Sequence, residues 1–115
     1  IRTGRYVRPA LGIEADEALN QRLQSTFGVA GVFLLRVAPD SAAERAGLKG
    51  ATASREGGIA PGDVIVAIDG KPVDTVGRLL GRLDNFQVGD TVRLTVVRDG
   101  REREVAVTLQ PGAGT

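Results

Sequence analysis

The apolar positions of this chain follow two periods, one typical of strands and the other typical of helices. Residues 31–37 are almost continuously apolar and include β-branched side chains, which predicts a strand buried on both faces and central in a sheet. Residues 64–68 form a second apolar run between two turn sequences. Residues 11–15 indicate a further strand that begins at a glycine-containing loop, after a short extended lead-in over residues 3–9.

A helix is predicted directly after this first strand. Asp16 can cap it, because its carboxylate accepts hydrogen bonds from the free amides of a first helical turn. Leu19, Leu23 and Phe27 recur at i, i+4 and i+8, and we assign this apolar stripe to the core. Gly28 supplies the left-handed residue that commonly ends a helix.

A second helix is predicted over residues 75–85, with Asp74 as its cap. Gly77 and Gly81 weaken it by up to about 1 kcal/mol each relative to alanine, so tertiary contacts must stabilise it. Its apolar stripe has helical spacing and consists of Val76, Leu79, Leu80 and Leu83.

Two further segments lie between these helices. Residues 41–46 predict a short helical turn that Ser41 opens and Gly47 closes. Residues 49–58 are small and polar without any period, which predicts an exposed loop and the least ordered part of the chain.

The chain ends with a strong hairpin signal. Residues 91–98 and 101–109 alternate between apolar and polar side chains and flank Asp99 and Gly100, a pair typical of a two-residue turn. Pairing across this turn predicts one buried face and one solvated face. The buried face sets Leu94 against Val105 and Val92 against Val107, and the solvated face carries Arg93 and Glu104.

These elements predict an α+β fold: a small, partly open β-barrel or sandwich of five or six strands, capped by two helices. A chain of 115 residues is long enough for one core and too short for two. We therefore expect a single domain over residues 1–115, with a folded core at 3–110, the exposed loop at 49–58 and a tail at 111–115.

Composition excludes several classes of function. Net charge is +1, with 15 basic and 14 acidic residues spread along the chain, so no basic face favours nucleic acid or anionic lipid. No apolar run approaches the roughly 20 residues of a membrane span, so we expect no membrane contact by this segment. The chain has no cysteine for a disulfide, and it begins without a methionine, which indicates a piece of a longer protein.

Catalysis by this chain alone is not expected. With no histidine, neither a serine triad nor the commonest zinc sites can form, so we predict no enzyme activity, no metal and no cofactor. A serine–lysine pair would have to come from Ser25, Ser41 or Ser54 with Lys49 or Lys71, and both lysines lie in polar, turn-like surroundings. Asp63 and Asp69 are typical turn formers.

Four motifs in a fixed order resemble the PDZ domains of HtrA/Deg serine proteases. The resemblance covers nearly the whole chain, and the strand next to the glycine-containing loop comes first, which is the circularly shifted order of that family. One departure is the longer segment between Leu48 and Pro61. The four motifs are Arg8 to Ile13 (RPALGI), Val37 to Leu48 (VAPDSAAERAGL), Gly58 to Val73 (GIAPGDVIVAIDGKPV), and Val88 to Val92 together with Arg98 to Gly100.

The resemblance implies a site that binds the carboxyl end of a peptide. The main-chain amides of Leu11, Gly12 and Ile13 would hold the terminal carboxylate, because a glycine-containing loop can point consecutive amides at one small volume. Arg8 would assist as a basic residue beside the loop, and its alternative interpretation is a solvated arginine.

The rest of the peptide would add as a strand beside Glu14 and Ala15 and point its side chains at the second predicted helix. We expect Leu80 and Leu83, with Leu11 and Ile13, to form the pocket for the last side chain. Val76 and Leu79 are assigned to the core.

The implied function is substrate delivery to, or regulation of, an attached protease. Expected partners are C-terminal peptides or unfolded proteins and the protease domain of the parent chain, in a homo-oligomeric parent located outside the cytoplasm or in an organelle. One alternative is a structural or oligomer-contact domain whose groove is filled by the parent protein. The other is a PDZ domain of a different protease or of a secretion component.

Overall fold

The computed structural model describes residues 9–53, 55 and 57–111. Its central sheet is antiparallel and has the strand order β10-β9-β7-β3, with β8 also paired to β7. The bounds of these strands are Arg101–Thr108 for β10, Thr91–Arg98 for β9, Val64–Ile68 for β7, Val32–Phe33 for β3 and Lys71–Pro72 for β8.

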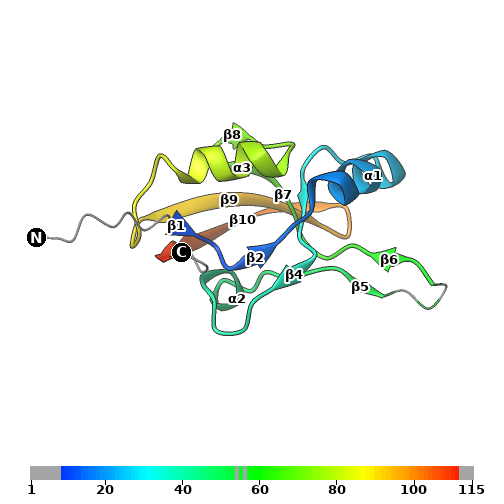
Figure 1. Cartoon of the computed structure of the whole chain (residues 1–115), viewed down its shortest axis with the longest axis horizontal. Helices are drawn as coiled ribbons and strands as arrows, with labels where there is room; N and C mark the ends of the chain where they lie inside the picture. Colours follow the sequence, from blue (N-terminus) through cyan, green and yellow to red (C-terminus); the bar gives the residue numbers. More distant parts are fainter. Residues whose placement is uncertain (1–8, 54, 56, 112–115) are drawn as a thin grey trace, which may run out of the picture.

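Three two-stranded pairs surround this sheet. The strand β1 (Pro9–Ala10) pairs with β11 (Gln110–Pro111), β2 (Ile13–Glu14) with β4 (Arg36–Val37), and β5 (Thr52–Ala53) with β6 (Ile59–Ala60). Figure 1 shows helix α3 on one side of the sheet, with α1 beyond the end of β2, while α2 lies below β2 and the β5–β6 pair projects from the body. The helices span Glu17–Phe27 (α1), Ala42–Arg45 (α2) and Val76–Leu83 (α3).

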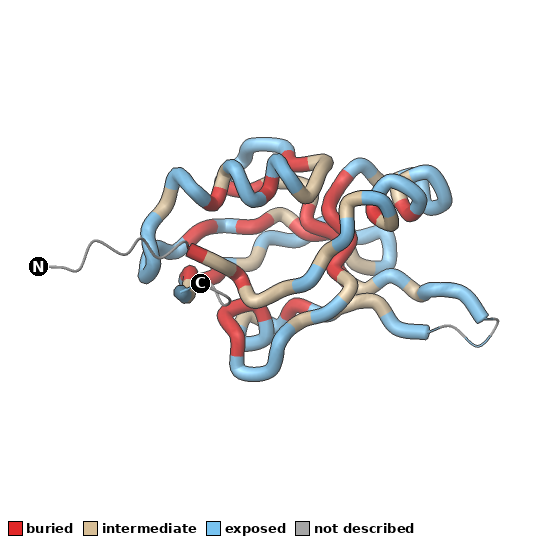
Figure 2. The backbone as a smooth tube through the Cα atoms, viewed as in Figure 1, coloured by how far each residue is buried: buried red, intermediate tan, exposed pale blue. Residues whose placement is uncertain are grey.

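A main core and a smaller one account for the buried apolar side chains. Figure 2 shows buried residues along the central strands and on the side of α3 that faces them, whereas the β5–β6 pair is largely exposed. The main core includes Leu11, Leu34, Ile65, Leu79, Leu83 and Leu94. The smaller core lies under α1 and is built on Leu23, Phe33 and Val64. The predicted α+β class is confirmed.

The predicted hairpin register is confirmed. Leu94 lies opposite Val105 and Val92 opposite Val107 in the β9–β10 pair. Arg93 Nε and Glu104 Oε1 are 3.7 Å apart on the solvated side, where both side chains are mostly exposed. The register follows because a two-residue turn leaves only one pairing that buries the apolar face.

The prediction of one central strand over residues 31–37 is wrong. The segment forms two short strands, with β3 at an end of the central sheet and β4 in a different pair. Between them the amide of Leu34 donates to the carbonyl of Asp63 (3.3 Å), whereas the amide of Leu35 donates to that of Glu14 (2.9 Å). The chain changes partners at this point, and apolarity alone could not indicate that.

The ends of α1 match the sequence. Asp16 Oδ2 accepts a hydrogen bond from the amide of Leu19 at 2.8 Å, and Gly28 has a φ of 71° at the other end. The predicted apolar stripe is only partly core, because Phe27 is 42% exposed and rests on Phe33 with a ring distance of 6.0 Å.

Helix α3 is shorter than predicted and is capped one residue later. Thr75 Oγ1, not Asp74, accepts a hydrogen bond from the amide of Arg78 (3.0 Å). Asp74 instead forms an ion pair with Arg78, at 3.4 Å. The helix ends at Leu83, before the predicted residue 85.

The short helix and the loop after it also have defined places. Ser41 Oγ caps α2 by accepting from the amide of Glu44 (3.1 Å), as predicted, and Gly47 has a φ of 86°. The segment 49–58 is largely exposed, as predicted, but it contains β5, which pairs with β6 directly after the segment. The lead-in over residues 3–8 and the tail at 112–115 lie outside the described residues.

Candidate functional site

The loop between β1 and β2 is held in one conformation from both sides. Gly12 has a φ of 86°, and a Cβ atom placed on it would overlap the side chain of Ser41, so only glycine fits. The carbonyls of Leu11 and Gly12 accept hydrogen bonds from the amides of Ala43 (2.9 Å) and Ala38 (2.8 Å). These bonds fix the orientation of the peptide groups in the loop.

The main-chain amides of this loop are the notable feature. Among the described residues, the amides of Leu11 and Gly12 donate to no protein acceptor. The hydrogen bond from the amide of Ala38 to the carbonyl of Gly12 makes these two residues a hydrogen-bonded pair of the antiparallel ladder. Hydrogen-bonded and non-hydrogen-bonded pairs alternate, so the next pair, Ile13 with Val37, is not hydrogen-bonded and the amide of Ile13 points away from β4. Three successive amides are therefore available at the start of β2.

Neighbouring side chains brace the loop. Ser41 Oγ donates to the carbonyl of Ala38 at 2.7 Å, and Gln110 Oε1 accepts from the amide of Ala42 at 2.5 Å. Both Ser41 and Ala42 are buried, so the loop rests on the start of α2 and on the last strand. Contacts within the domain thus hold the conformation of the loop.

The edge of β2 beside the loop is open in the described part of the chain. Strand β2 pairs with β4 on one side only. Ile13 and Ala15 are partly buried against the main core, and so is Val76 on α3. An open strand edge beside apolar side chains is a template for adding another strand.

Helix α3 presents Leu80, not Leu83, to solvent. Leu80 is 49% exposed, whereas Leu83 is 3% exposed and packs in the main core with Leu79. The predicted sharing of an accessible wall by Leu80 and Leu83 is therefore corrected. Leu79 and Leu83 lie one turn apart on the buried face, and Val76 and Leu80 lie one turn apart on the accessible side.

Residues 9–109 match the family described as PDZ domain. The chain belongs to this family. Curated relatives of the PDZ domain include the chloroplastic Protease Do-like 1 of Arabidopsis thaliana, 34% identical over 113 residues, and the periplasmic serine endoprotease DegP of Escherichia coli (strain K12), 33% identical over 110 residues. The alignments cover 96% and 93% of this chain but 25% and 21% of those proteins. The chain therefore spans about a quarter or less of these relatives.

Solved structures share its fold. The HtrA-type protease AlgW with decapeptide superposes with a TM-score of 0.74 at 23% identity, covering 98% of this chain and 32% of that chain. The HtrA3 PDZ domain bound to a phage-derived ligand has a TM-score of 0.66 at 19% identity, covering 93% of this chain and 90% of that chain. At these identities the likeness establishes the fold.

The structure of the PDZ domain brings most of the predicted site residues together. Leu11 and Gly12 lie in the loop, Ile13 begins β2 and Ala15 follows it. Leu11 is part of the main core, and Ile13 and Ala15 pack against that core, to which Leu79 and Leu83 of α3 also belong. Glu14 is exposed, and its carbonyl already accepts a hydrogen bond from the amide of Leu35. Its side chain lies 4.0 Å from that of Arg36, and this exposed carboxylate is the part of Glu14 that a ligand could contact. Arg8 lies outside the described residues.

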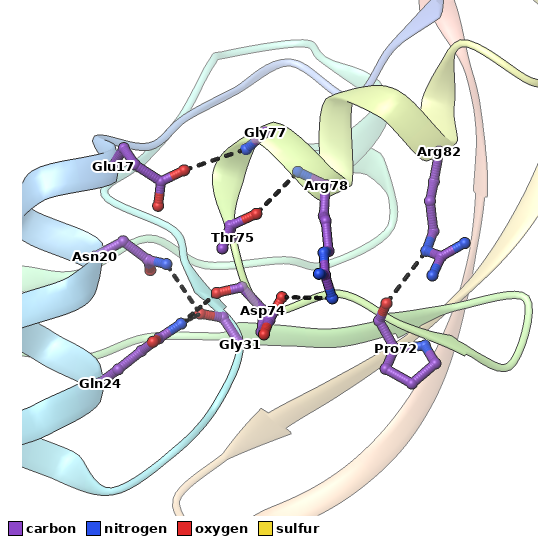
Figure 3. A network of polar contacts seen from close by, with 10 residues as sticks. All are labelled: Glu17, Asn20, Gln24, Gly31, Pro72, Asp74, Thr75, Gly77, Arg78 and Arg82. Atoms are coloured by element: carbon purple, nitrogen blue, oxygen red, sulfur yellow. Dashed lines mark hydrogen bonds and ion pairs between the residues drawn. The ribbon is translucent and has the colours of Figure 1, made fainter.

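Contacts between α1 and the start of α3 were not predicted from the sequence. Figure 3 shows Glu17 of α1 accepting a hydrogen bond from the amide of Gly77 (3.3 Å), while Gln24 Nε2 donates to the carbonyls of Gly31 (2.8 Å) and Asp74. These contacts join residues far apart in the sequence, so no local pattern predicts them.

An ion pair between a buried Asp63 and a partly exposed Arg98 was also missed. Asp63 is fully buried and accepts two hydrogen bonds from Arg98, both at 2.7 Å, and one from the amide of Lys49 at 2.9 Å. Burial raises the pKa of the Asp63 carboxyl, but the Arg98 and Lys49 hydrogen bonds with the Arg98 charge outweigh it, so the pKa lies below its ordinary value. Because Arg98 Nη2 also donates to the carbonyl of Gly47 (2.9 Å), the pair is structural.

Neither a metal site nor a membrane-crossing helix is found in the described ranges. No group of three or more acidic side chains there is arranged to hold a metal ion. None of the described helices is both long and apolar enough to cross a membrane.

Proposed function

We propose that this PDZ domain binds the free carboxyl end of a polypeptide and so delivers substrate to, or regulates, an HtrA/Deg-type serine protease. The observation that carries the proposal is the set of unused amides at Leu11, Gly12 and Ile13 beside the open edge of β2. A carboxylate accepts several hydrogen bonds in a small volume, and no other single group of a peptide does so as well.

The expected affinity is modest. Hydrogen bonds to a charged group contribute roughly 1.5 to 3 kcal/mol each, and burial of one apolar side chain contributes about 1.5 to 3 kcal/mol. Against the cost of ordering a peptide, these terms support micromolar binding, about −8 kcal/mol. Micromolar affinity suits a domain that must release what it captures.

The accessible apolar side chains of α3 suggest which side chains of the ligand the domain contacts. Val76 and Leu80 are four residues apart on α3, a rise of about 6 Å. Alternate residues of an added strand lie about 6.7 Å apart and point the same way. We infer that the last side chain meets Leu80 and Ile13, with Leu11 and Leu83 beneath, and that the side chain two residues earlier meets Val76.

The protease assignment rests on the relatives. Among the curated proteins that match this chain, two are described as periplasmic serine proteases and another as a chloroplastic protease. We propose that the domain itself is non-catalytic and that its ligands are C-terminal peptides or unfolded proteins. The parent protein would carry the protease domain and form a homo-oligomer outside the cytoplasm or in an organelle.

The direct test compares one peptide as the free acid and as the C-terminal amide by isothermal titration calorimetry. We expect the amide to bind at least tenfold more weakly, because it loses the charge-assisted hydrogen bonds. The Leu80→Arg variant should also bind at least tenfold more weakly, and Gln21→Arg on the exposed side of α1 should bind normally. Equal affinities for acid and amide would overturn the proposed function.

A further inference from the structure

A hollow of about 470 Å³ lies between the carboxyl end of α3 and the turn that joins β7 to β8. We call it the α3–β8 hollow. Its volume falls in the range of small-molecule sites, roughly 300 to 1,000 Å³. Its lining consists of Ile68, Asp69, Lys71, Arg82, Asn85 and Phe86.

This hollow and the proposed peptide site lie on opposite flanks of α3. Successive residues of an α-helix are rotated by about 100°, so the side chains of Leu80 and Arg82 point about 160° apart. Leu79 and Leu83 occupy the face between them and pack in the main core. A molecule in the hollow would therefore contact Arg82 without reaching Leu80.

Two cationic side chains of the lining carry unneutralised charge. Arg82 is partly buried, and its Nε donates to the carbonyl of Pro72 at 3.2 Å, which holds the guanidinium beside β8 (Figure 3). Lys71 is the other cation and is exposed. Among the described residues, neither Arg82 nor Lys71 forms an ion pair. The terminal nitrogens of both side chains can therefore donate to a ligand.

The acidic residue of the lining does not cancel these charges. Asp69 supplies one negative charge against the two positive ones, and its Oδ1 already accepts from the amide of Arg93 at 2.8 Å. A second hollow, which shares Asp69, shows the contrast: Arg93 and Glu104 line it and lie 3.7 Å apart as an ion pair. Only the α3–β8 hollow of these two keeps a net positive lining.

The floor of the α3–β8 hollow is apolar. Ile68 is 1% exposed, and Phe86 is partly buried against the main core. A ligand with an apolar body would cover this floor, which favours binding in proportion to the apolar area removed from water. A carboxylate on the same ligand would suit the cations, because a guanidinium binds a carboxylate through two parallel hydrogen bonds.

We propose that the α3–β8 hollow is a second binding site of this PDZ domain, for small carboxylic acids that carry an apolar body such as a ring or a short alkyl chain. The carboxylate lies between Lys71 and Arg82, and the apolar body rests on Ile68 and Phe86. The site is independent of the proposed function, because none of its lining residues belongs to the loop after β1 or to β2.

The first experiment titrates the 115-residue chain with three probes and follows its amide signals by two-dimensional NMR. The probes are 3-phenylpropionate, 3-phenyl-1-propanol, which lacks the charge, and acetate, which lacks the ring. We expect 3-phenylpropionate to shift the amides of Lys71, Asn85 and Phe86 with a dissociation constant of about 1 mM or tighter. The alcohol and acetate should bind at least tenfold more weakly.

Three results of this titration would overturn the proposal. Equal binding of the alcohol would show that the cations play no part, and equal binding of acetate would show that the apolar floor plays none. Saturating shifts at Gly12 and Ile13 in place of Lys71, Asn85 and Phe86 would show that the probe occupies the loop of the proposed peptide site. The absence of any saturating shift would also overturn it.

The second experiment repeats the 3-phenylpropionate titration on charge variants. Lys71→Gln and Arg82→Gln should each weaken binding at least fivefold. Arg93→Gln is the matched control, because it removes the same charge from the other hollow, and it should change affinity less than twofold. Lys71 is exposed, so Lys71→Gln decides the question even if Arg82→Gln lowers stability. Unchanged affinity in Lys71→Gln, or equal losses in Lys71→Gln and Arg93→Gln, would refute a specific site.

Discussion

The central sheet and the β2 edge differ in how far their main-chain and polar groups are hydrogen-bonded within the domain. In the sheet, β7, β9 and β10 pair along their lengths, and the buried Asp63 is satisfied by Arg98 and by the amide of Lys49. At the edge, two loop amides have no acceptor among the described residues, and Leu80 is half exposed. Stability and ligand binding are thus assigned to different parts of the domain, and substitutions should separate them.

The largest effect should come from Arg98→Ala. Removing Arg98 leaves the buried Asp63 carboxylate without its two side-chain hydrogen bonds, and an uncompensated buried charge costs about 3 to 5 kcal/mol. Urea unfolding would measure the free energy of unfolding, with Arg101→Ala, an exposed hairpin arginine, as the control. A change in the free energy of unfolding below about 1 kcal/mol would show that water replaces Arg98 as the hydrogen-bond partner of Asp63.

Two leucines three residues apart on α3 should give opposite phenotypes. Leu83→Ala should lower the free energy of unfolding by about 2 to 5 kcal/mol, because it creates a cavity in the main core. Leu80→Ala should change stability by less than about 1 kcal/mol, since the side chain is half exposed, but it should weaken peptide binding. Measuring the free energy of unfolding and the peptide affinity of both variants separates the two roles. A Leu80→Ala variant as unstable as Leu83→Ala would refute the assignment of Leu80 to the accessible face.

A smaller effect is expected where α1 contacts the start of α3. Gln24→Ala removes the donor to Gly31 and Asp74 and should cost about 1 kcal/mol, the usual net value of a hydrogen bond. Gln21→Ala, on the exposed side of the same helix, should cost close to nothing. If both variants unfold at the same urea concentration as the parent, the bonds of Gln24 do not fix α1.

The smallest effect should appear as a pH dependence. Because the pKa of Asp63 is lowered in the folded state, its contribution is present above the ordinary carboxyl pKa of about 4 and is lost as pH falls through the lower folded value. The free energies of unfolding of the parent and of Asp63→Asn, measured between about pH 2 and 6, would show this loss. Subtracting one from the other removes the contribution of the other carboxyl groups, which both proteins share. Arg98 and Arg103 are the charges that favour the ionised form, and a difference independent of pH would contradict this account.

Local patterns predicted several elements whose cause lies within a few residues, although the cap of α3 was placed one residue early. The β9–β10 register followed from Asp99 and Gly100, and the ends of α1 followed from Asp16 and Gly28. The glycine-containing loop was located from its sequence because Gly12 needs a backbone conformation that other residues rarely adopt. Its role in the proposed function came from the resemblance to a family and remains a prediction.

The larger failures depended on partners distant in the sequence. Residues 31–37 divide between two sheets because Asp63 and Glu14 supply different acceptors, and an apolar run looks the same in either case. Leu80 and Leu83 have the same side chain, and only the direction from which the sheet meets α3 decides that one is buried and the other exposed.

The sequence by itself determined the class of fold, the turns, the hairpin register and the loop with its glycine, because each depends on the backbone preferences of adjacent residues. Only the tertiary structure decided the Asp63–Arg98 pair, the exposed face of α3 and the contacts between α1 and the start of α3. Those features are contacts between segments tens of residues apart, and their energies exist only when the whole chain has packed.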